Sequence, residues 1–205
     1  NGYIRLIVTR GAGSLGLSPN SCENPSVIII ANEIQLYPPE LYEKGMEIIT
    51  AATSRNFVNA INPAIKSLNY LNNILAKIEA SHAGCEEAIM LNSDGFVAEC
   101  TGDNLFIFHH GILFTPPLAA GALHGITRNT VMELAQESGY TVQERNLTRY
   151  DLYIAQECFL TGSGAEIVPV VKIDQRVIGE GIPGEVTKEL DQKYRTLTKV
   201  AGEPL

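Results

Sequence analysis

Residues 88–99 read Ala88-Ile89-Met90-Leu91-Asn92-Ser93-Asp94-Gly95-Phe96-Val97-Ala98-Glu99. Two apolar runs, 88–92 and 96–99, flank Ser93-Asp94-Gly95, a set of residue types that favours a tight turn. Such a pattern predicts a β-hairpin. His110-Gly111 follows another apolar run and predicts a second hairpin in the same way. The middle of the chain is therefore expected to form antiparallel sheet.

Strand-like runs rich in β-branched residues recur along the chain, and helix-like segments are fewer. Strands are expected at Ile4–Thr9, Val27–Ala31, Glu47–Ala52, Ala88–Asn92, Phe96–Glu99, Leu105–His109, Thr141–Glu144, Glu157–Thr161 and Ile167–Ile173. Helices are expected at Asn69–His82, Ile126–Ser138 and Gly184–Val200. This order predicts a mixed α and β architecture without regular βαβ alternation. Because no repeat or long linker interrupts it, we expect one domain over residues 1–205.

The first of these helices carries a narrow apolar stripe. Leu71, Ile74, Leu75 and Ile78 recur at the spacing of one helix face, and Gly84 follows as a stop signal. We expect this stripe to pack on the sheet.

Composition excludes several classes of function. The 205 residues are 45% hydrophobic and carry a formal net charge of -8, and no stretch gathers the Lys and Arg residues that a nucleic-acid site needs. No apolar run is long enough for a transmembrane helix. The four cysteines and four histidines form no metal-ligand pattern, which favours a reduced, cytoplasmic compartment. The chain begins at Asn1, directly before strand-like sequence, and is interpreted as a piece of a longer protein.

Residues 11–16 match a dinucleotide-binding motif, because they spell G-x-G-x-x-G after a strand-like run and precede Glu33. The motif works only where its last glycine opens a helix. Pro19 and Pro25 leave no room for that helix before Val27. A glycine-rich loop is therefore expected here.

Three polar segments interrupt the core pattern and suggest parts of one site. Lys66 stands alone before a helix, and a lysine withdrawn from water can become a nucleophilic amine. Glu99 ends a strand and leads into the polar connection 101–104. Two loops, 121–128 and 160–166, are rich in glycine and hydroxyl residues, and the first runs into a helix start, where free N–H groups favour an anion.

Together these segments resemble the class IV (fold-type IV) pyridoxal-phosphate aminotransferase family, which includes branched-chain aminotransferases, D-amino-acid transaminases and aminodeoxychorismate lyase. The resemblance covers nearly the whole chain. Its markers, in order, are Gly2-Tyr3-Ile4-Arg5, Lys66 before Asn69-Tyr70-Leu71, Glu99 before Gly102-Asp103-Asn104-Leu105-Phe106, Phe114-Thr115-Pro116-Pro117, Gly125-Ile126-Thr127-Arg128 and Thr161-Gly162-Ser163-Gly164-Ala165-Glu166. The family's large domain implies antiparallel-rich curved sheets that form a pseudo-barrel with flanking helices.

The resemblance also implies a role for each marker residue. Lys66 would carry pyridoxal 5'-phosphate as a Schiff base and shuttle the substrate proton, Glu99 would face the pyridine nitrogen, and Tyr70, one helical turn past Lys66, would bind the phenolic oxygen. The cofactor phosphate would be held by Ile126, Thr127 and Ser163. The substrate carboxylate would be held by Tyr3 and Arg5 with Ser163 and Gly164.

Tyrosine at position 70 resembles the branched-chain enzymes, which implies transamination of L-leucine, L-isoleucine and L-valine with 2-oxoglutarate by a homodimer or higher homo-oligomer. D-amino-acid transaminase and lyase activities stay open within the family. So does a truncated, non-catalytic domain, because the family's small N-terminal domain, which supplies an arginine to the phosphate, has no counterpart in this sequence.

Overall fold

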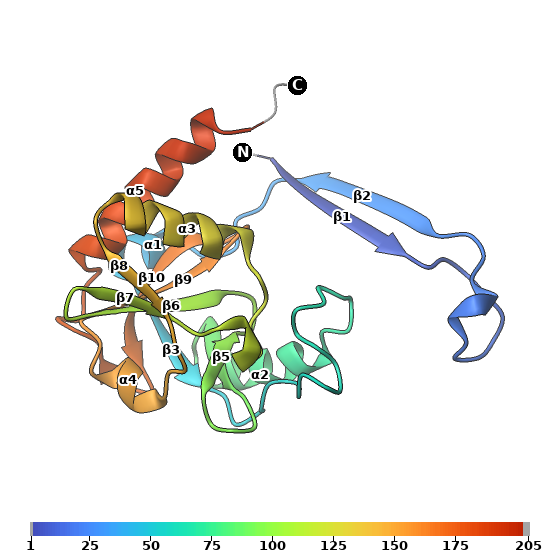
Figure 1. Ribbon diagram of the computed structural model, residues 1–205, viewed down its shortest axis with the longest axis horizontal. Coiled ribbons are helices and arrows are strands. Elements are labelled where there is room, and N and C mark those ends of the chain that lie inside the picture. The colour runs from blue at the N-terminus through green and yellow to red at the C-terminus, as the bar shows by residue number, and fades with distance from the viewer. Residues whose placement is uncertain (1, 203–205) are drawn as a thin grey trace. The chain divides into compact units, whose positions relative to one another are not determined.

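In the computed structural model, which describes residues 2–202, the chain divides into two compact units. The boundary between them in the sequence falls between Leu36 and Tyr37. The first unit is a β-hairpin of β1 (Tyr3–Thr9) and β2 (Ser26–Asn32), drawn in blue in Figure 1. Their connecting loop holds only a short 3₁₀ helix, η1 (Pro19–Ser21). No α-helix follows Gly16 within this described loop, whereas a dinucleotide-binding motif needs its last glycine to open one.

The hairpin exposes large apolar side chains along both strands. Ile4, Leu6 and Val8 of β1 are each more than 60% exposed, and Val27 and Ile29 of β2 are similarly open. A lone two-stranded ribbon is marginally stable in water. The hairpin therefore needs apolar cover from atoms outside itself.

The second unit is built on a mixed sheet with the strand order β5-β4-β3-β10-β9-β6-β7-β8, and β11 pairs with β10. Five pairs are antiparallel (β4/β5, β6/β7, β6/β9, β9/β10 and β10/β11), whereas β3/β10, β3/β4 and β7/β8 are parallel. The strands are β3 (Met46–Thr50), β4 (Glu87–Leu91), β5 (Val97–Cys100), β6 (Asn104–His109), β7 (Ile112–Thr115), β8 (Thr141–Glu144), β9 (Glu157–Gly162), β10 (Glu166–Ile173) and β11 (Arg176–Val177). The predicted antiparallel-rich, mixed architecture is confirmed.

Both predicted hairpins are present. In the first, the Asn92 side chain accepts the N–H groups of Asp94 and Phe96, each at 3.0 Å, and so holds the turn between β4 and β5. In the second, His110 and Gly111 have φ angles of 48° and 79°, the left-handed geometry that two-residue hairpin turns use. Strand β7 follows this second turn. It is not among the strands expected from the sequence, where only its last residues, Phe114 and Thr115, belong to a family marker.

The sheet curls, because consecutive strands occupy distant places in its order. β5 lies at one edge and β6 lies five places away, yet the short connection 101–103 joins them. The Cys100 N–H donates to the Asp103 carbonyl at 2.8 Å across this connection. Such a short link requires the edge at β5 to turn back toward β6, and the resulting curled sheet agrees with the curved sheets of the pseudo-barrel that the family resemblance implies.

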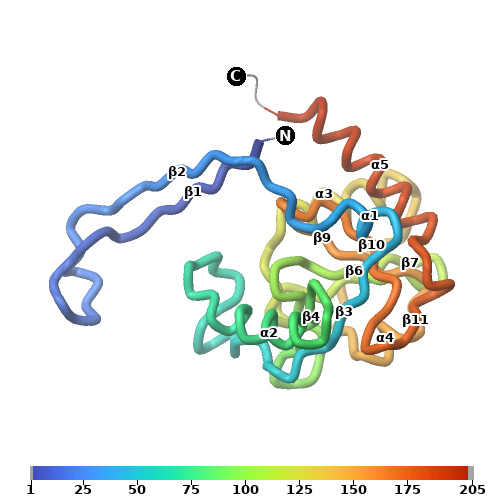
Figure 2. Tube along the Cα trace, turned by 180° about the vertical axis from the view of Figure 1, so that it is seen from behind, coloured from blue at the N-terminus to red at the C-terminus, as the bar shows by residue number. Residues whose placement is uncertain are grey.

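The helices cover this sheet from several sides. α3 (Ile126–Glu137) and α5 (Glu185–Val200) lie side by side against β8, β9 and β10 (Figure 1), and stacked rings of Phe106 and Phe159, 5.1 Å apart, fill the core beneath them. α1 (Pro39–Lys44) runs beside β10, as Figure 2 shows from behind. The remaining helices are α2 (Leu71–His82), η2 (Leu118–Ala120) and α4 (Arg149–Tyr153). None of the helices within residues 2–202 has the length and hydrophobicity to cross a membrane.

The predicted packing of α2 is wrong. Leu71, Ile74, Leu75 and Ile78 are 45–63% exposed, whereas Ala76 and Ala80 on the opposite side are fully buried against Ala88 and Met90 of β4. Small alanines let the helix approach the sheet closely, and a hydrophobic periodicity count gives them little weight. The helix also begins at Leu71, two residues later than expected.

Candidate functional site

Glu99 is the most tightly held side chain of the candidate site. It lies at the end of β5, only 5% exposed, and its Oε2 accepts the Leu123 N–H at 2.8 Å and the Asn104 side-chain amide at 3.1 Å. Its Oε1 forms a buried ion pair with the Arg55 guanidinium. Donors from three separate segments of the chain thus converge on the Glu99 carboxyl group.

The protonation of Glu99 reflects two opposing influences. Burial raises the pKa of Glu99 to about 7, while Arg55, the Leu123 N–H and the Lys66 ammonium lower it. Asp103 nearby behaves similarly, because burial and Glu87 raise its pKa to about 6 and the Tyr37 hydroxyl, which donates at 2.7 Å, lowers it. Both carboxyl groups therefore depend on their neighbours to stay ionised.

Lys66 has the opposite surroundings. It lies in a turn-rich loop before α2 and is exposed, with its Nζ 3.4 Å from the Tyr70 hydroxyl. This loop leaves the Lys66 side chain open to solvent in the described part of the chain. Tyr70 meets Lys66 across a non-helical segment, as the residue just before α2, and not one helical turn along it as expected.

Two contacts hold the loop that carries Lys66 against the end of β5 that carries Glu99. The Asn73 side chain donates to the Thr101 carbonyl at 2.7 Å and so ties the first turn of α2 to the residues after β5. Pro63 is buried near Gly121. The Lys66 ammonium is also among the charges that lower the pKa values of Glu99 and Asp103.

The start of α3 is open to an anion. The N-cap residue is Gly125, and no side chain accepts a hydrogen bond from the first turn of the helix. The N–H groups of Ile126 and Thr127 have no hydrogen-bond partner among the described residues. Thr127 is buried, with its hydroxyl 3.3 Å from that of Tyr194, whereas Ile126 is 79% exposed. Such a helix terminus attracts negative charge through free donors and the helix dipole.

Asp103 and Asn104 brace the two predicted anion loops. A β-carbon on Gly125 would come within 2.1 Å of Asn104 Oδ1, and one on Gly162 within 2.2 Å of Asp103 Oδ1. Both glycines are thus required by close packing. Asn104 also pairs with Thr161 in the β6/β9 register, so the loop before α3 and the loop after β9 lie on either side of it.

The second loop offers further polar groups. Thr161 is buried, and its hydroxyl lacks a partner within the described part of the chain, while Ser163 is exposed. The sequence pointed to this loop but did not identify Arg55, Asp103 or Asn104 as site residues. Asp103 and Asn104 looked like an ordinary turn, and Arg55 carried no pattern beyond its charge.

Tyr3 and Arg5 belong to the hairpin unit. They are alternate residues of β1 and therefore share one face of that strand. Because Tyr3 and Arg5 lie in the first compact unit and Lys66 in the second, the approach of these two residues to Lys66 stays a prediction.

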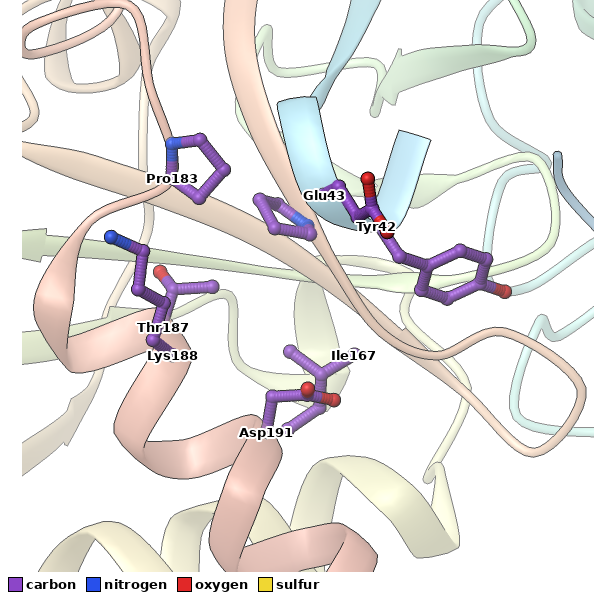
Figure 3. Close-up of a pocket in the computed structure, with 8 residues that line it drawn as sticks. Tyr42, Glu43, Ile167, Pro183, Thr187, Lys188 and Asp191 are labelled. Atoms are coloured by element: carbon purple, nitrogen blue, oxygen red, sulfur yellow. The ribbon is translucent and has the colours of Figure 1, made fainter. Parts of the chain in front are cut away.

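The hollow in Figure 3 lies elsewhere on the second unit. It measures about 270 Å³ and is lined by residues of α1, β10 and α5, including Tyr42, Ile167 and Asp191. None of the residues that surround Glu99 or Lys66 lines it. Across residues 2–202, no group of His, Cys, Asp and Glu side chains is arranged to hold a metal ion.

The model of the amino-transferase class IV family matches residues 1–173. The chain belongs to this family. A Methanocaldococcus jannaschii relative, provisionally named a branched-chain-amino-acid aminotransferase, is 51% identical over 95% of this chain and 67% of its own length. This class IV aminotransferase also resembles the crystal structure of the Escherichia coli branched-chain amino acid aminotransferase, with a TM-score of 0.93, 38% identity and coverage of 96% of this chain and 65% of that one.

A further similar structure is a branched-chain amino acid aminotransferase, designated T.th., with pyridoxamine 5'-phosphate; the TM-score is 0.89, with 39% identity and coverage of 95% of this chain and 64% of that one. The same enzyme has been solved with N-(5'-phosphopyridoxyl)-L-glutamate. The chain spans about two thirds of the length of these relatives. The fold-type IV architecture is thereby shown.

Class IV aminotransferases use pyridoxal 5'-phosphate, and the residues of the second unit fit this cofactor. The Glu99 carboxylate has four accepting positions, of which described residues fill three, so one on Oε1 can accept a ring N–H. The free N–H groups at the start of α3 and the buried, unpartnered Thr161 hydroxyl suit a phosphate group. Lys66 supplies an amine and Tyr70 a phenol.

Proposed function

We propose that this chain carries the cofactor site of a transaminase that transfers amino groups between branched-chain L-amino acids and 2-oxoglutarate. The observation that carries the proposal is that Asn104 contacts both Glu99 and the open start of α3: its side-chain amide donates to Glu99, and its Oδ1 packs closely against Gly125. In addition, the Lys66 ammonium lowers the pKa of Glu99. The names of the relatives and the tyrosine at position 70 support the substrate class. The phosphopyridoxyl-glutamate adduct in the similar T.th. enzyme supports 2-oxoglutarate as the amino acceptor.

Lys66 has two tasks in this proposal. Its amine would hold pyridoxal phosphate covalently, and it would also move a proton between the substrate α-carbon and the cofactor C4′ atom. The Tyr70 hydroxyl, 3.4 Å from Nζ, helps to orient the amine and binds the cofactor's phenolic oxygen.

Glu99 holds the proton on the pyridine nitrogen. When bound, pyridoxal phosphate supplies a ring that accepts the electrons of the broken C–H bond, and it does so best with its nitrogen protonated. A carboxylate on Glu99 stabilises that proton by a charge-assisted hydrogen bond. The chemistry therefore depends on the ionised form of this buried side chain.

The remaining residues bind and orient. The N–H groups of Ile126 and Thr127 and the Ser163 hydroxyl hold the cofactor phosphate. Tyr3 and Arg5, with the backbone of Ser163 and Gly164, receive the substrate carboxylate, an assignment that rests on the family resemblance. The same resemblance supports a homodimer or higher homo-oligomer and a small N-terminal domain as parts of the working enzyme.

The test is covalent trapping. We expect the chain with added pyridoxal phosphate to show the visible absorbance of a lysine-bound cofactor, and borohydride followed by peptide mass spectrometry to locate the cofactor on Lys66. Lys44→Ala, which changes an exposed lysine of α1, is the matched control and should trap normally. Trapping on another lysine would refute the site assignment.

Substrate choice needs a second measurement. The protein that carries the cofactor on Lys66 should convert L-leucine and 2-oxoglutarate to L-glutamate, whereas D-alanine should not react. Reaction with D-alanine alone would favour a D-amino-acid transaminase, and pyruvate release from aminodeoxychorismate would favour the lyase. Failure to bind the cofactor at all would favour a non-catalytic domain.

A further inference from the structure

Arg55 is a buried cation with no place in the proposed reaction so far. Its side chain is 6% exposed, and its Nε donates to the Gly121 carbonyl at 3.1 Å. One terminal nitrogen lies 3.9 Å from the Met90 sulfur, and the other is paired with Glu99 Oε1. An arginine keeps its charge in proteins, so its burial beside Met90 is tolerable only with a negative partner.

The hydrogen bonds around Glu99 favour the carboxylate form of that partner. The Arg55 guanidinium, the Asn104 amide and the Leu123 N–H all donate to it. A protonated Glu99 would carry a hydrogen that none of these three groups can accept. The charged groups that face Glu99 are Arg55, Lys66 and Asp103, and of these Arg55 is the only one in direct contact.

We propose that Arg55 is a positioning residue of the cofactor site, which holds Glu99 ionised and turned so that the free position on Oε1 receives the ring N–H of pyridoxal phosphate. This inference rests on the proposed function. Without Arg55, a buried glutamic acid would keep its own proton and donate it to an unprotonated ring nitrogen. Arg55 thus decides which of the two atoms holds the shared proton.

Arg55 also connects this proton to the phosphate end. Its bond to the Gly121 carbonyl and the contact of its Cγ with Gly121 fix the beginning of the loop that leads through Leu123 to α3. The same loop supplies the Leu123 N–H to Glu99. One side chain therefore sets both the charge of Glu99 and the position of the backbone group that binds it.

The experiment reads the ring nitrogen directly. The full chain, loaded with pyridoxal phosphate labelled with ¹⁵N in the ring, is compared by NMR with Arg55→Met and Arg55→Lys. We expect a protonated nitrogen in the parent and in R55K, and an unprotonated nitrogen in R55M. Turnover of L-leucine should fall by about 10²-fold in R55M and less in R55K, because R55K keeps the charge.

A double variant separates this role from a purely structural one. R55M/E99Q leaves no buried charge unpaired, and we expect its ring nitrogen to be unprotonated, with no further loss beyond that of E99Q. If R55M does not retain cofactor, the double variant should regain it, and failure to regain it would overturn the inference in favour of a structural arginine. A protonated ring nitrogen in R55M would also overturn it.

The two proposals fail differently. If the parent does not carry the cofactor on Lys66, the proposed function is wrong. If the parent does so, and R55M keeps both the cofactor and the protonated ring nitrogen, only the role of Arg55 is wrong.

Discussion

Glu99 and Lys66 serve one cofactor from opposite surroundings. Glu99 is buried and accepts three hydrogen bonds from Arg55, Asn104 and Leu123, whereas Lys66 is exposed and contacts only the Tyr70 hydroxyl among the described residues. The difference matches their tasks: a group that holds a proton in place benefits from a rigid, dry site, and a group that changes partners during turnover must be free to move. This contrast predicts that changes at the two residues separate chemistry from stability.

The largest effect on cofactor binding is expected from a substitution of the exposed Lys66. Lys66→Ala should abolish borohydride trapping and the visible absorbance of the lysine-bound cofactor. Because the side chain is exposed, the free energy of unfolding without cofactor should change by no more than about 0.5 kcal/mol. Chemical denaturation of the cofactor-free protein checks this, and a large loss of stability would show that Lys66 has a structural role as well.

At the buried end, one substitution should damage both properties. Glu99→Gln leaves the Arg55 charge unpaired in the interior, which costs about 3–5 kcal/mol in such pairs. It should also lower kcat by about 10²- to 10³-fold through loss of charge at the ring nitrogen. Glu43→Gln, at an exposed position of α1, is the control. Unchanged stability in E99Q would contradict the ion pair.

A substitution at Gly125 can disturb the close contact between Asn104 and the loop before α3 without changing any charged residue. Gly125→Ala places a β-carbon 2.1 Å from Asn104 Oδ1, so the Asn104 side chain must shift and its Nδ2 group loses the hydrogen bond that it donates to Glu99. We expect a stability loss of about 1–3 kcal/mol and weaker cofactor binding, measured by denaturation and fluorescence titration. Gly102→Ala is the matched control, because its β-carbon would meet only Glu87 Oε2, at 3.7 Å. Equal effects of the two substitutions would refute the brace.

The smallest effect is a pH dependence confined to the buried end. Burial and the nearby Glu87 raise the folded-state pKa of Asp103 to about 6, above its ordinary value of 3.8. The folded protein therefore retains a proton on Asp103 that the unfolded chain releases. The stabilising contribution of this group is present below pH 4 and is lost as the pH rises through about 6, at up to about 1.4 kcal/mol per pH unit.

Denaturation of the cofactor-free protein between pH 4 and pH 8 tests this slope. Asp103→Asn keeps an acceptor for the Tyr37 hydroxyl and should flatten the slope between pH 4 and pH 6. Lys66→Ala should leave most of the slope in place. A slope that D103N does not alter would mean that Asp103 stays ionised in the folded protein.

Much of the fold and the site could be read from local sequence. Both hairpin turns, the helices at 126 and 185 and the strands around them follow from residue types and periodicity, and the marker residues located Lys66, Glu99 and the two loops. The buried face of α2 could not be read, because the stripe of Leu71 and Ile78 outweighs the small Ala76 and Ala80 in any count of hydrophobicity. Arg55 and Asn104 were missed because their roles depend on partners distant in the chain.

The sequence by itself determined which groups are available: one lysine before a helix, one glutamate after a strand and glycines where the chain must pass closely. Only the tertiary structure decided their states. Arg55 and Glu99 lie 44 residues apart and meet through the pairing of β4 with β5 beside β3, and the raised pKa of Glu99 follows from burial by several elements at once. Local patterns encode conformation, whereas ionisation and ion pairing depend on the surroundings that the whole fold creates.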